Sequence, residues 1–402
     1  MKALRKTFDD LKPQFAKGGK FEKFYYLFEA LETFTFVPNH TTPARGVQVR
    51  DQIDLKRLMM TVVIAMIPPL MFSFWHTGHM HYISTGVEAS FIEKGLIGLQ
   101  LVLPIVIVAY AGGGLVEVVF ALWRKHPINE GYLVTGMLIA LIMPVTIPLW
   151  QVFLAGVFAV VIAKEVFGGT GMNVLNIALT ARVFLYFAYP TDISGSTVWN
   201  YVGDMEPVAG YSGATALGVF AENNVIDNGW TGLEALNVAG AWAPYDLYSP
   251  LSMFLGSIPG SLGETSKLMI LIGAAILIVS GTGSWKIILS VLIGALATGY
   301  LVNATAVNSY MAVPAHYHLL VGSLLFGAVY MATDPVSASH TEKGKLIYGF
   351  LIGVVTVIIR VFNPVYPEGV QMAILLMNVF APLIDHYVVL GNKNRRLKRA
   401  TI

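Results

Sequence analysis

Ten stretches of mostly apolar residues, each about 20 residues long, constrain this chain more than any other feature. A helix of about 20 such residues crosses the hydrocarbon core of a bilayer, where only helices and closed barrels satisfy every backbone polar group. Only 12% of the 402 residues are charged, about half the share in a soluble domain. The stretches are 56–76, 95–122, 132–149, 151–168, 172–189, 267–283, 285–304, 316–334, 346–363 and 370–390. They predict an all-α integral membrane protein with about ten transmembrane helices.

Lysine and arginine are unevenly distributed among the connections between these stretches. Cytoplasmic loops carry an excess of both. Residues 190–266 contain neither, and ten spans place every basic connection on the opposite side. The basic connections are 54–57, 123–127, 284–286, 341–345 and 393–399. We therefore expect both termini in the cytoplasm and the 190–266 segment outside it.

Five spans precede the long outer segment and five follow it. An odd number of spans per half turns one half over relative to the other, as in many transporters. No sequence repeat is evident, so two inverted five-helix halves are an interpretation of the span count alone. The predicted parts are a cytoplasmic segment (1–55), a first half (56–189), an extracytoplasmic segment (190–266), a second half (267–390) and a basic cytoplasmic tail (391–402).

The N-terminal segment contains one helical pattern, at residues 20–34. Its apolar residues recur at helical spacing: Phe21, Phe24, Tyr25, Phe28 and Leu31. Such a helix lies on the membrane surface or docks against a partner subunit, and the sequence does not choose between the two.

Composition excludes several classes of function. The chain has no cysteine, which rules out disulfides, thiolate nucleophiles and Cys-ligated metal centres. No signal peptide is visible, and no basic face interleaved with aromatic residues suggests nucleic-acid binding. His79 and His81, and His316 and His318, form two pairs, but spacing of two residues does not bring both rings together on a helix. No structural metal is predicted.

Several charged residues lie inside the apolar stretches. A charge near the bilayer centre costs about 2.5–3.5 kcal/mol on insertion scales, so such residues are functional candidates. Each could also reach the interface or pair with another helix. For the set, a pathway for a cation or proton is the more attractive interpretation, because carboxylates suit hard cations. The residues are Glu117, Lys164, Glu165, Arg182, Asp334, Arg360 and Asp385.

Two polar motifs end spans on the cytoplasmic side. In "FGGTGMNVLNIALTAR" (167–182), Asn173 and Asn176 share one face, which suits a ligand site beside a helix N-terminus or close helix packing. In "MATDPVSAS" (331–339), Asp334 precedes Pro335 and either caps the next turn or contacts a polar ligand. On the outer side, the small residues of "GYSGATALG" (210–218) are on their own typical of a turn.

Several longer stretches resemble the family of B-type subunits of the Na+-translocating NADH:quinone oxidoreductases, and the resemblance runs along essentially the whole chain. The stretches are "VRDQIDLKRLM", "LWRKHPINEG", "AKEVFGGTGMN", "FAYP", "GYSGATAL", "IPGSLGE", "YMATDPVSASHTEKGK", "RVFNPVYPEG" and "APLIDH". The glycine run at 112–114 departs from the family in having three glycines followed by Leu-Val, which puts the shape of a quinone pocket in doubt.

The resemblance implies two flavins and their sites. It implies FMN joined to Thr215 through a phosphoester, with Ser212, Gly213 and Ala214 beside it, attached by a separate flavin transferase. It implies non-covalent riboflavin held by Thr135, Asn173, Asn176 and Asp334. It implies quinone reduction near Gly113 and Gly114, and Na+ uptake involving Glu29, Glu117 and Asp385.

The resemblance also implies a setting. It predicts a multi-pass protein of a bacterial inner membrane with Thr215 on the periplasmic side. Partners would be quinone, Na+, an NADH-oxidising flavin and iron–sulfur subunit, a second FMN subunit and membrane subunits. No residue of this chain is expected to act as a catalytic nucleophile or base. Three alternatives stay open: the D-type subunit of an Rnf-type ferredoxin:NAD oxidoreductase, a channel or secondary transporter without redox chemistry, and a scaffold subunit.

Overall fold

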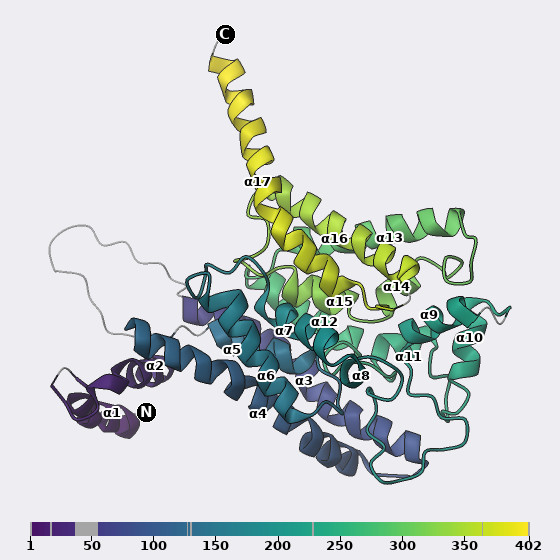
Figure 1. The fold of residues 1–402 in the computed structure, drawn as a ribbon, viewed down its shortest axis with the longest axis horizontal. Coiled ribbons are helices and arrows are strands. Elements are labelled where there is room, and N and C mark those ends of the chain that lie inside the picture. The colour runs from purple at the N-terminus through teal and green to yellow at the C-terminus, as the bar shows by residue number, and fades with distance from the viewer. Residues whose placement is uncertain are drawn as a thin grey trace.

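The computed structural model describes residues 2–16, 18–36, 55–126, 128, 131–226, 229–363 and 365–400. Every regular element in this part of the chain is helical (Figure 1). The N-terminal elements are α1 (Lys2–Phe15), η1 (Glu22–Phe24) and α2 (Tyr25–Thr35). The first series of membrane helices is α3 (Leu55–Thr85), α4 (Phe91–Arg124), α5 (Gly131–Leu141), α6 (Leu149–Ala159), the π-helix η2 (Val160–Glu165) and α7 (Ile177–Ala188).

The outer segment and the second series complete the chain. The outer segment contains α8 (Pro190–Ile193), α9 (Ala216–Ile226), α10 (Gly232–Ala239) and α11 (Pro250–Leu255). The second series is α12 (Lys267–Val279), α13 (Trp285–Ala304), α14 (Tyr317–Leu320), α15 (Leu324–Phe326), the π-helix η3 (Gly327–Met331), α16 (Glu342–Phe362) and α17 (Val370–Ala400). In Figure 1, α1 and α2 lie at one end of the body, α9 and α10 lie at the other, and the end of α17 projects alone.

The predicted all-α membrane fold is confirmed, but half of the predicted spans are not simple helices. By length and composition, five helices in the described ranges could cross a membrane: Lys56–Thr85, Phe91–Arg124, Trp285–Ala304, Glu342–Phe362 and Val370–Ala400. The other five predicted spans are short or broken, and α5 ends at Leu141, before Pro144 and Pro148. Proline lacks the N–H that a continuing helix needs. In contrast, α3 and α17 extend about two and a half to three turns beyond their predicted ends.

Packing between the helices follows the same order in both series. In the first series, α4 packs against α5 and α6, α6 packs against α7, and α5 contacts both α3 and α7. In the second series, α13 packs against η3 and α16, and α16 packs against α17. The π-helix η3 takes the place of α5 and contacts both α12 and α17. The exception is the long α3–α4 hairpin. Contacts of α3 with α12 and of α7 with α17 join the two series. Because each series has five spans, this pattern is that of an inverted repeat.

With the packing known, a weak sequence repeat can be aligned. "LVTGMLIALIMPVTIP" (133–148) matches "LVGSLLFGAVYMATDP" (320–335), and "VFGGTGMNVLNIA" (166–178) matches "VFNPVYPEGVQMA" (361–373). This repeat is not evident from the sequence alone and becomes visible only when the packing is known. Few of the aligned residues are identical. The aligned segments share mainly their apolar character and the positions where helices break.

The N-terminal pattern at 20–34 forms η1 and α2, as predicted, and it packs against a helix that was not predicted. Phe28 is buried, and its ring stacks on Phe15 of α1 with the ring centres 4.7 Å apart. The Lys12 ammonium lies 3.0 Å from the Glu32 carboxylate. Phe21, Phe24 and Leu31 remain exposed.

Close packing of α13 and α16 depends on glycine and gives a direct test of the fold. A Cβ added at Gly353 would lie 2.2 Å from the Val291 carbonyl oxygen, whereas nothing lies within 4 Å of one added at Gly391. We expect Gly353→Ala to lower stability by about 1–3 kcal/mol because the helices must move apart. Gly391→Ala should be neutral or stabilising, because Ala favours helix by about 1 kcal/mol. Thermal unfolding of the two variants in the same detergent checks this, and equal melting temperatures would contradict the packing.

Candidate functional sites

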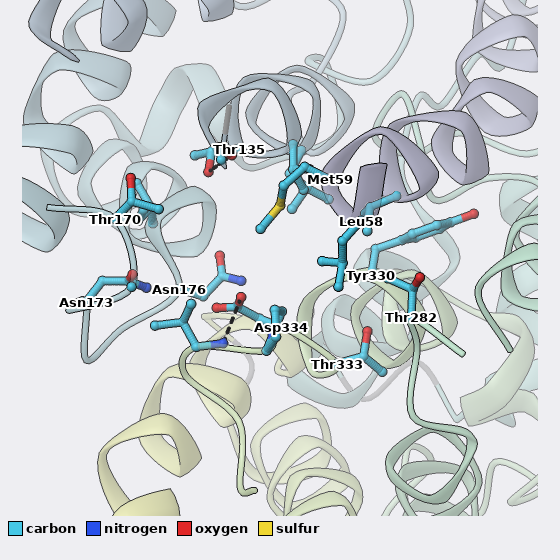
Figure 2. A pocket seen from close by; sticks show the side chains of 18 of the residues that line it. Leu58, Met59, Thr135, Thr170, Asn173, Asn176, Thr282, Tyr330, Thr333 and Asp334 are labelled. Atoms are coloured by element: carbon cyan, nitrogen blue, oxygen red, sulfur yellow. Dashed lines mark hydrogen bonds between the residues drawn. The ribbon is translucent and has the colours of Figure 1, made fainter. Parts of the chain in front are cut away.

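One cavity lies where the predicted cytoplasmic ends of both series meet. It is lined from α3, α5, η2, the loop before α7 and the loop after η3. Thr135, Asn173, Asn176 and Asp334 all line this space, which we call the Asp334 cavity. Figure 2 shows Thr170, Asn173 and Asn176 on one side, with Asp334 beside Asn176 and Thr135 beyond it. The structure therefore brings together all four residues that the sequence analysis assigned to one ligand.

Local hydrogen bonds fix the polar groups of the Asp334 cavity. Asn176 caps α7, because its Oδ1 accepts a hydrogen bond from the Leu179 N–H at 3.2 Å. Asp334 Oδ2 accepts one from the Ser337 hydroxyl at 2.6 Å. The capping interpretation of Asp334 is thus correct, and the same carboxylate still borders the cavity. Asn173 donates from Nδ2 to the Leu175 carbonyl at 3.0 Å. These bonds hold amide and carboxylate groups at fixed positions on the cavity wall.

A second cavity surrounds Thr215 near the predicted outer side. It has a volume of about 510 Å³ and is lined from α7, the 193–199 loop, α9 and the 365–368 loop before α17. We call it the Thr215 cavity. Thr215 lines it and caps α9, since its Oγ1 accepts a hydrogen bond from the Gly218 N–H at 3.1 Å. The hydroxyl thus lies at the positive end of an 11-residue helix.

The 212–214 backbone before Thr215 is held tightly. The Tyr248 hydroxyl donates to the Ala214 carbonyl at 2.6 Å. Burial raises the pKa of Tyr248, so this hydroxyl stays protonated and keeps its bond throughout the physiological pH range. A Cβ on Gly213 would lie 2.4 Å from the Ser196 carbonyl oxygen, so close packing explains this glycine. Ala214 borders the cavity, whereas Ser212 and Gly213 support the loop from behind.

The Thr215 cavity has a buried wall of mixed charge. Arg182 donates from Nη1 to the Ile142 carbonyl, and its guanidinium carbon lies 5.8 Å from the centre of the Trp199 ring. Glu368 accepts a hydrogen bond from the Ser323 hydroxyl at 2.6 Å. Arg182 was singled out in the sequence, but Glu368 was not. Glu368 lies just before a predicted span, where a carboxylate is ordinary. The alignment of 166–178 with 361–373 pairs Glu368 with Asn173, and this pairing is the one signal that could have found it.

Four charged side chains join α4 to η2 near the Asp334 cavity. The Lys164 ammonium pairs with the Glu117 carboxylate, and both side chains are almost completely buried. About two turns further along α4, the Arg124 guanidinium pairs with Glu165 at 3.0 Å. Paired charges that hold helices together were one of the interpretations left open, and the structure supports it for these residues. Lys164 also lines the Asp334 cavity.

Gly113 and Gly114, assigned to quinone, differ in their surroundings. The Tyr132 hydroxyl accepts a hydrogen bond from the Gly113 N–H at 3.0 Å and donates one to the Ala109 carbonyl at 2.5 Å. A Cβ on Gly113 would lie 2.3 Å from that hydroxyl oxygen. Neither glycine lines the Asp334 or the Thr215 cavity. Close packing of α4 on α5 therefore explains Gly113, and the quinone role stays a prediction.

The carboxylates assigned to Na+ uptake lie on three separate helices. Glu29 is half-buried on α2, and Glu117 is buried on α4. Asp385 of α17 accepts four hydrogen bonds at the start of α16, from the Ser339 hydroxyl (2.7 Å), the His340 N–H (2.7 Å), and the N–H (2.9 Å) and hydroxyl (2.6 Å) of Thr341. A structural role explains Asp385, whereas Glu117 lies beside a cavity.

Comparison with known proteins identifies close relatives over the whole chain. The model of the "NQR2, RnfD, RnfE family" matches residues 43–393. A protein of Chromohalobacter salexigens, named as the B-type subunit of Na(+)-translocating NADH-quinone reductase, is 46% identical over 98% of this chain and 96% of its own length. Proteins of the same name from Ectopseudomonas mendocina and Klebsiella pneumoniae are each 44% identical over 98% of this chain and 99% of their own lengths.

The contrast between the two glycines of α4 can be measured. Gly113→Ala should destabilise the protein by about 1–3 kcal/mol, because the new methyl group meets the buried Tyr132 side chain. In Gly114→Ala the methyl group would lie 3.7 Å from the Tyr132 ring, which is ordinary contact, so stability should not fall. Thermal unfolding in detergent distinguishes the two variants. A stable Gly113→Ala protein with defective quinone reduction would instead indicate a direct quinone contact.

Proposed function

The chain belongs to the NQR2, RnfD, RnfE family, and on that premise we propose that it is the B-type subunit of a Na+-translocating NADH:quinone oxidoreductase. In this proposal it carries covalent FMN on Thr215 and non-covalent riboflavin, and it passes electrons to quinone as the complex exports Na+. The observation that supports it best is the placement of Thr215. A threonine in a loop of small residues faces a cavity large enough for a flavin, at the end of a helix that favours a phosphate.

The residues of the Thr215 cavity fit a phosphoryl-linked flavin. The Thr215 oxygen can carry the phosphate while remaining close to the first N–H groups of α9. Arg182 supplies a buried positive charge, and Trp199 and Tyr366 supply aromatic faces in the cavity wall. Ordinary cofactor pockets enclose about 300–1,000 Å³. At about 510 Å³, the Thr215 cavity lies within this range.

The Asp334 cavity fits a second flavin without a phosphate. Leu58, Met59 and Leu138 provide apolar walls, and Thr135, Asn173 and Asn176 provide hydroxyl and amide groups for a polar ring edge or a ribityl chain. Lys164 is the one cation among the described residues that line it, and it is already paired with a carboxylate. Such a wall suits riboflavin better than a nucleotide, whose phosphates need unpaired positive charge.

The flavins, when bound, supply the electron-transfer chemistry, and the chain positions them and excludes water. The chain's own residues do the rest: Asn176 and Asp334 are fixed by their caps, and Arg182 is fixed by its bond to the Ile142 carbonyl. The oxidation of NADH is assigned to a partner subunit. The partner subunits and the bacterial inner membrane location are part of this proposal, which the names of the relatives and the charge pattern support.

Two rival functions make different predictions. The D-type subunit of an Rnf-type complex shares the family, but the relatives described above carry the name of the quinone reductase subunit and match nearly end to end. NADH-driven quinone reduction by the purified complex separates these two. A channel or secondary transporter predicts no flavin on either site.

Covalent attachment is tested on Thr215. The protein is produced in a host that contains the flavin transferase, denatured, and examined for in-gel fluorescence under ultraviolet light. Wild type should fluoresce, and Thr215→Ala should be dark because the accepting hydroxyl is gone. Peptide mass mapping should show FMN on the peptide that contains residues 210–218.

Thr215→Ser is the matched control, because it keeps a hydroxyl at the same position. It should retain at least part of the fluorescence. A dark wild-type band with an unmodified peptide would exclude the flavoprotein assignment and favour the transporter interpretation.

Binding of the second flavin is tested with Asn176→Asp. This change keeps the oxygen that caps α7 and replaces the amide donor with a second oxygen. A lost hydrogen bond to a buried ligand costs about 1–3 kcal/mol, so acid-extractable riboflavin should bind about tenfold or more weakly. The melting temperature of the flavin-free protein measures separately the cost of the new carboxylate beside Asp334. Unchanged riboflavin content at limiting riboflavin would show that this amide does not contact the ligand.

A further inference from the structure

The C-terminal end of α17 leaves the body of helices. Asp385 accepts hydrogen bonds from residues 339–341, just before α16 begins, which fixes it level with the start of α16. Residues 386–400 continue the helix beyond this point for about 22 Å, and every residue from 391 to 400 is exposed. We call residues 386–400 the tail helix, and we propose that it binds the anionic phospholipid headgroups at the predicted cytoplasmic surface of the membrane.

The tail helix concentrates positive charge. Each of its basic residues has another basic residue three or four positions away, and like charges at these spacings weaken a helix. No carboxylate occurs in residues 386–402 to offset them. An anionic surface beside the tail helix removes this repulsion, and each basic residue near such a surface strengthens attachment about fivefold. The basic residues are Lys393, Arg395, Arg396, Lys398 and Arg399.

An apolar stripe runs along α17 into the tail helix. Its members are spaced by four, three and seven residues, which places them on one face of the helix. They are Leu383, Tyr387, Leu390 and Leu397, and between 39% and 65% of each is exposed. Lys393 and Lys398 flank the stripe, where their stems can lie along apolar surface while the ammonium groups reach phosphate. An apolar stripe between lysines is typical of helices that lie at a membrane surface.

The direction of the tail helix favours lipid over a partner protein. In Figure 1, α13 and α16 run across the body, whereas the last turns of α17 rise steeply away from that direction. Because α13 and α16 are long and apolar enough to be membrane spans, a helix that leaves across their direction runs along the membrane surface. Tyr387 lies where α17 leaves the body, and tyrosine is enriched at membrane–water interfaces. The positive-inside rule explains basic residues here, but it does not require an exposed apolar stripe between them.

The composition of the chain allows a direct test. The chain has no cysteine, so a single introduced cysteine can carry an environment-sensitive nitrobenzoxadiazole dye. Asn394→Cys places the dye on the apolar stripe. Asn392→Cys is the matched control, because it also replaces an asparagine and lies about 200° around the helix from position 394. The full-length chain is reconstituted in nanodiscs of phosphatidylcholine, or of equal parts of phosphatidylcholine and phosphatidylglycerol.

The dye at position 394 should report docking on the anionic nanodiscs. Its fluorescence should rise about twofold or more and shift to the blue, because the stripe enters the boundary between headgroups and acyl chains. High salt should reverse the change by screening. The dye at position 392 should respond much less, because it faces water.

Charge variants test the basic residues. Arg395→Gln combined with Arg396→Gln should lower the equilibrium constant of docking about 25-fold, so the response at position 394 should be lost. Lys125→Gln combined with Lys343→Gln removes the same charge from exposed positions on the same predicted side, outside the tail helix. That pair should keep the response.

Three results would overturn the inference. The first is equal fluorescence at position 394 in the two kinds of nanodisc, and the second is an equal response from position 392. The third is a dye at position 394 that stays in water on anionic nanodiscs and is buried only when the other subunits are added, which would show that the tail helix binds a partner protein. The inference goes beyond the proposed function and does not depend on it, because absence of flavin from Thr215 would leave these expectations unchanged.

Discussion

Buried cationic side chains hold the broken helices of this protein in place. Where a helix ends inside a membrane its carbonyl groups lose their partners, and no water replaces them. Arg182 donates to the Ile142 carbonyl after α5, and Arg360 donates to the carbonyls of His318, Val321 and Glu368. Lys267 donates to the Glu264 and Gly322 carbonyls. Without these bonds the breaks would carry unsatisfied polar groups, each costing several kcal/mol. The breaks are possible because these three cations are buried.

The same breaks create both candidate sites. Irregular backbone at membrane depth is tolerated where it lines a cavity. The loop before α7 borders the Asp334 cavity, and the loop before α17 borders the Thr215 cavity. The alignment of 166–178 with 361–373 makes these two loops equivalent. The proposed inverted repeat would bring equivalent loops to opposite sides of the membrane. One architectural device, a broken span opposite a loop that begins a helix, thus yields two cavities within one chain.

The sequence predicted the composition of the sites better than the shape of the helices. Asn173, Asn176 and Asp334 stood out because polar residues at span ends are costly without a purpose, and the structure places all three around one cavity. Pro144 and Pro148 mark the break in the span at 132–149, but the break in 316–334 could not be predicted, because no proline lies inside that apolar stretch. Gly113 was assigned by resemblance, and its contact with Tyr132 depends on how α4 meets α5. Glu368 carried no signal of its own, since a carboxylate near a span end is ordinary until its neighbours are known.

The two cavities differ in what their buried cation binds. Each cavity has one cation among its described lining residues, Arg182 in one and Lys164 in the other. Arg182 donates to a backbone carbonyl, which does not neutralise the guanidinium charge. Lys164 is paired with the carboxylate of Glu117, which neutralises the ammonium charge. Two cavities bordered by equivalent loops therefore offer different charges to a ligand, and only the cavity with Arg182 suits a phosphate group.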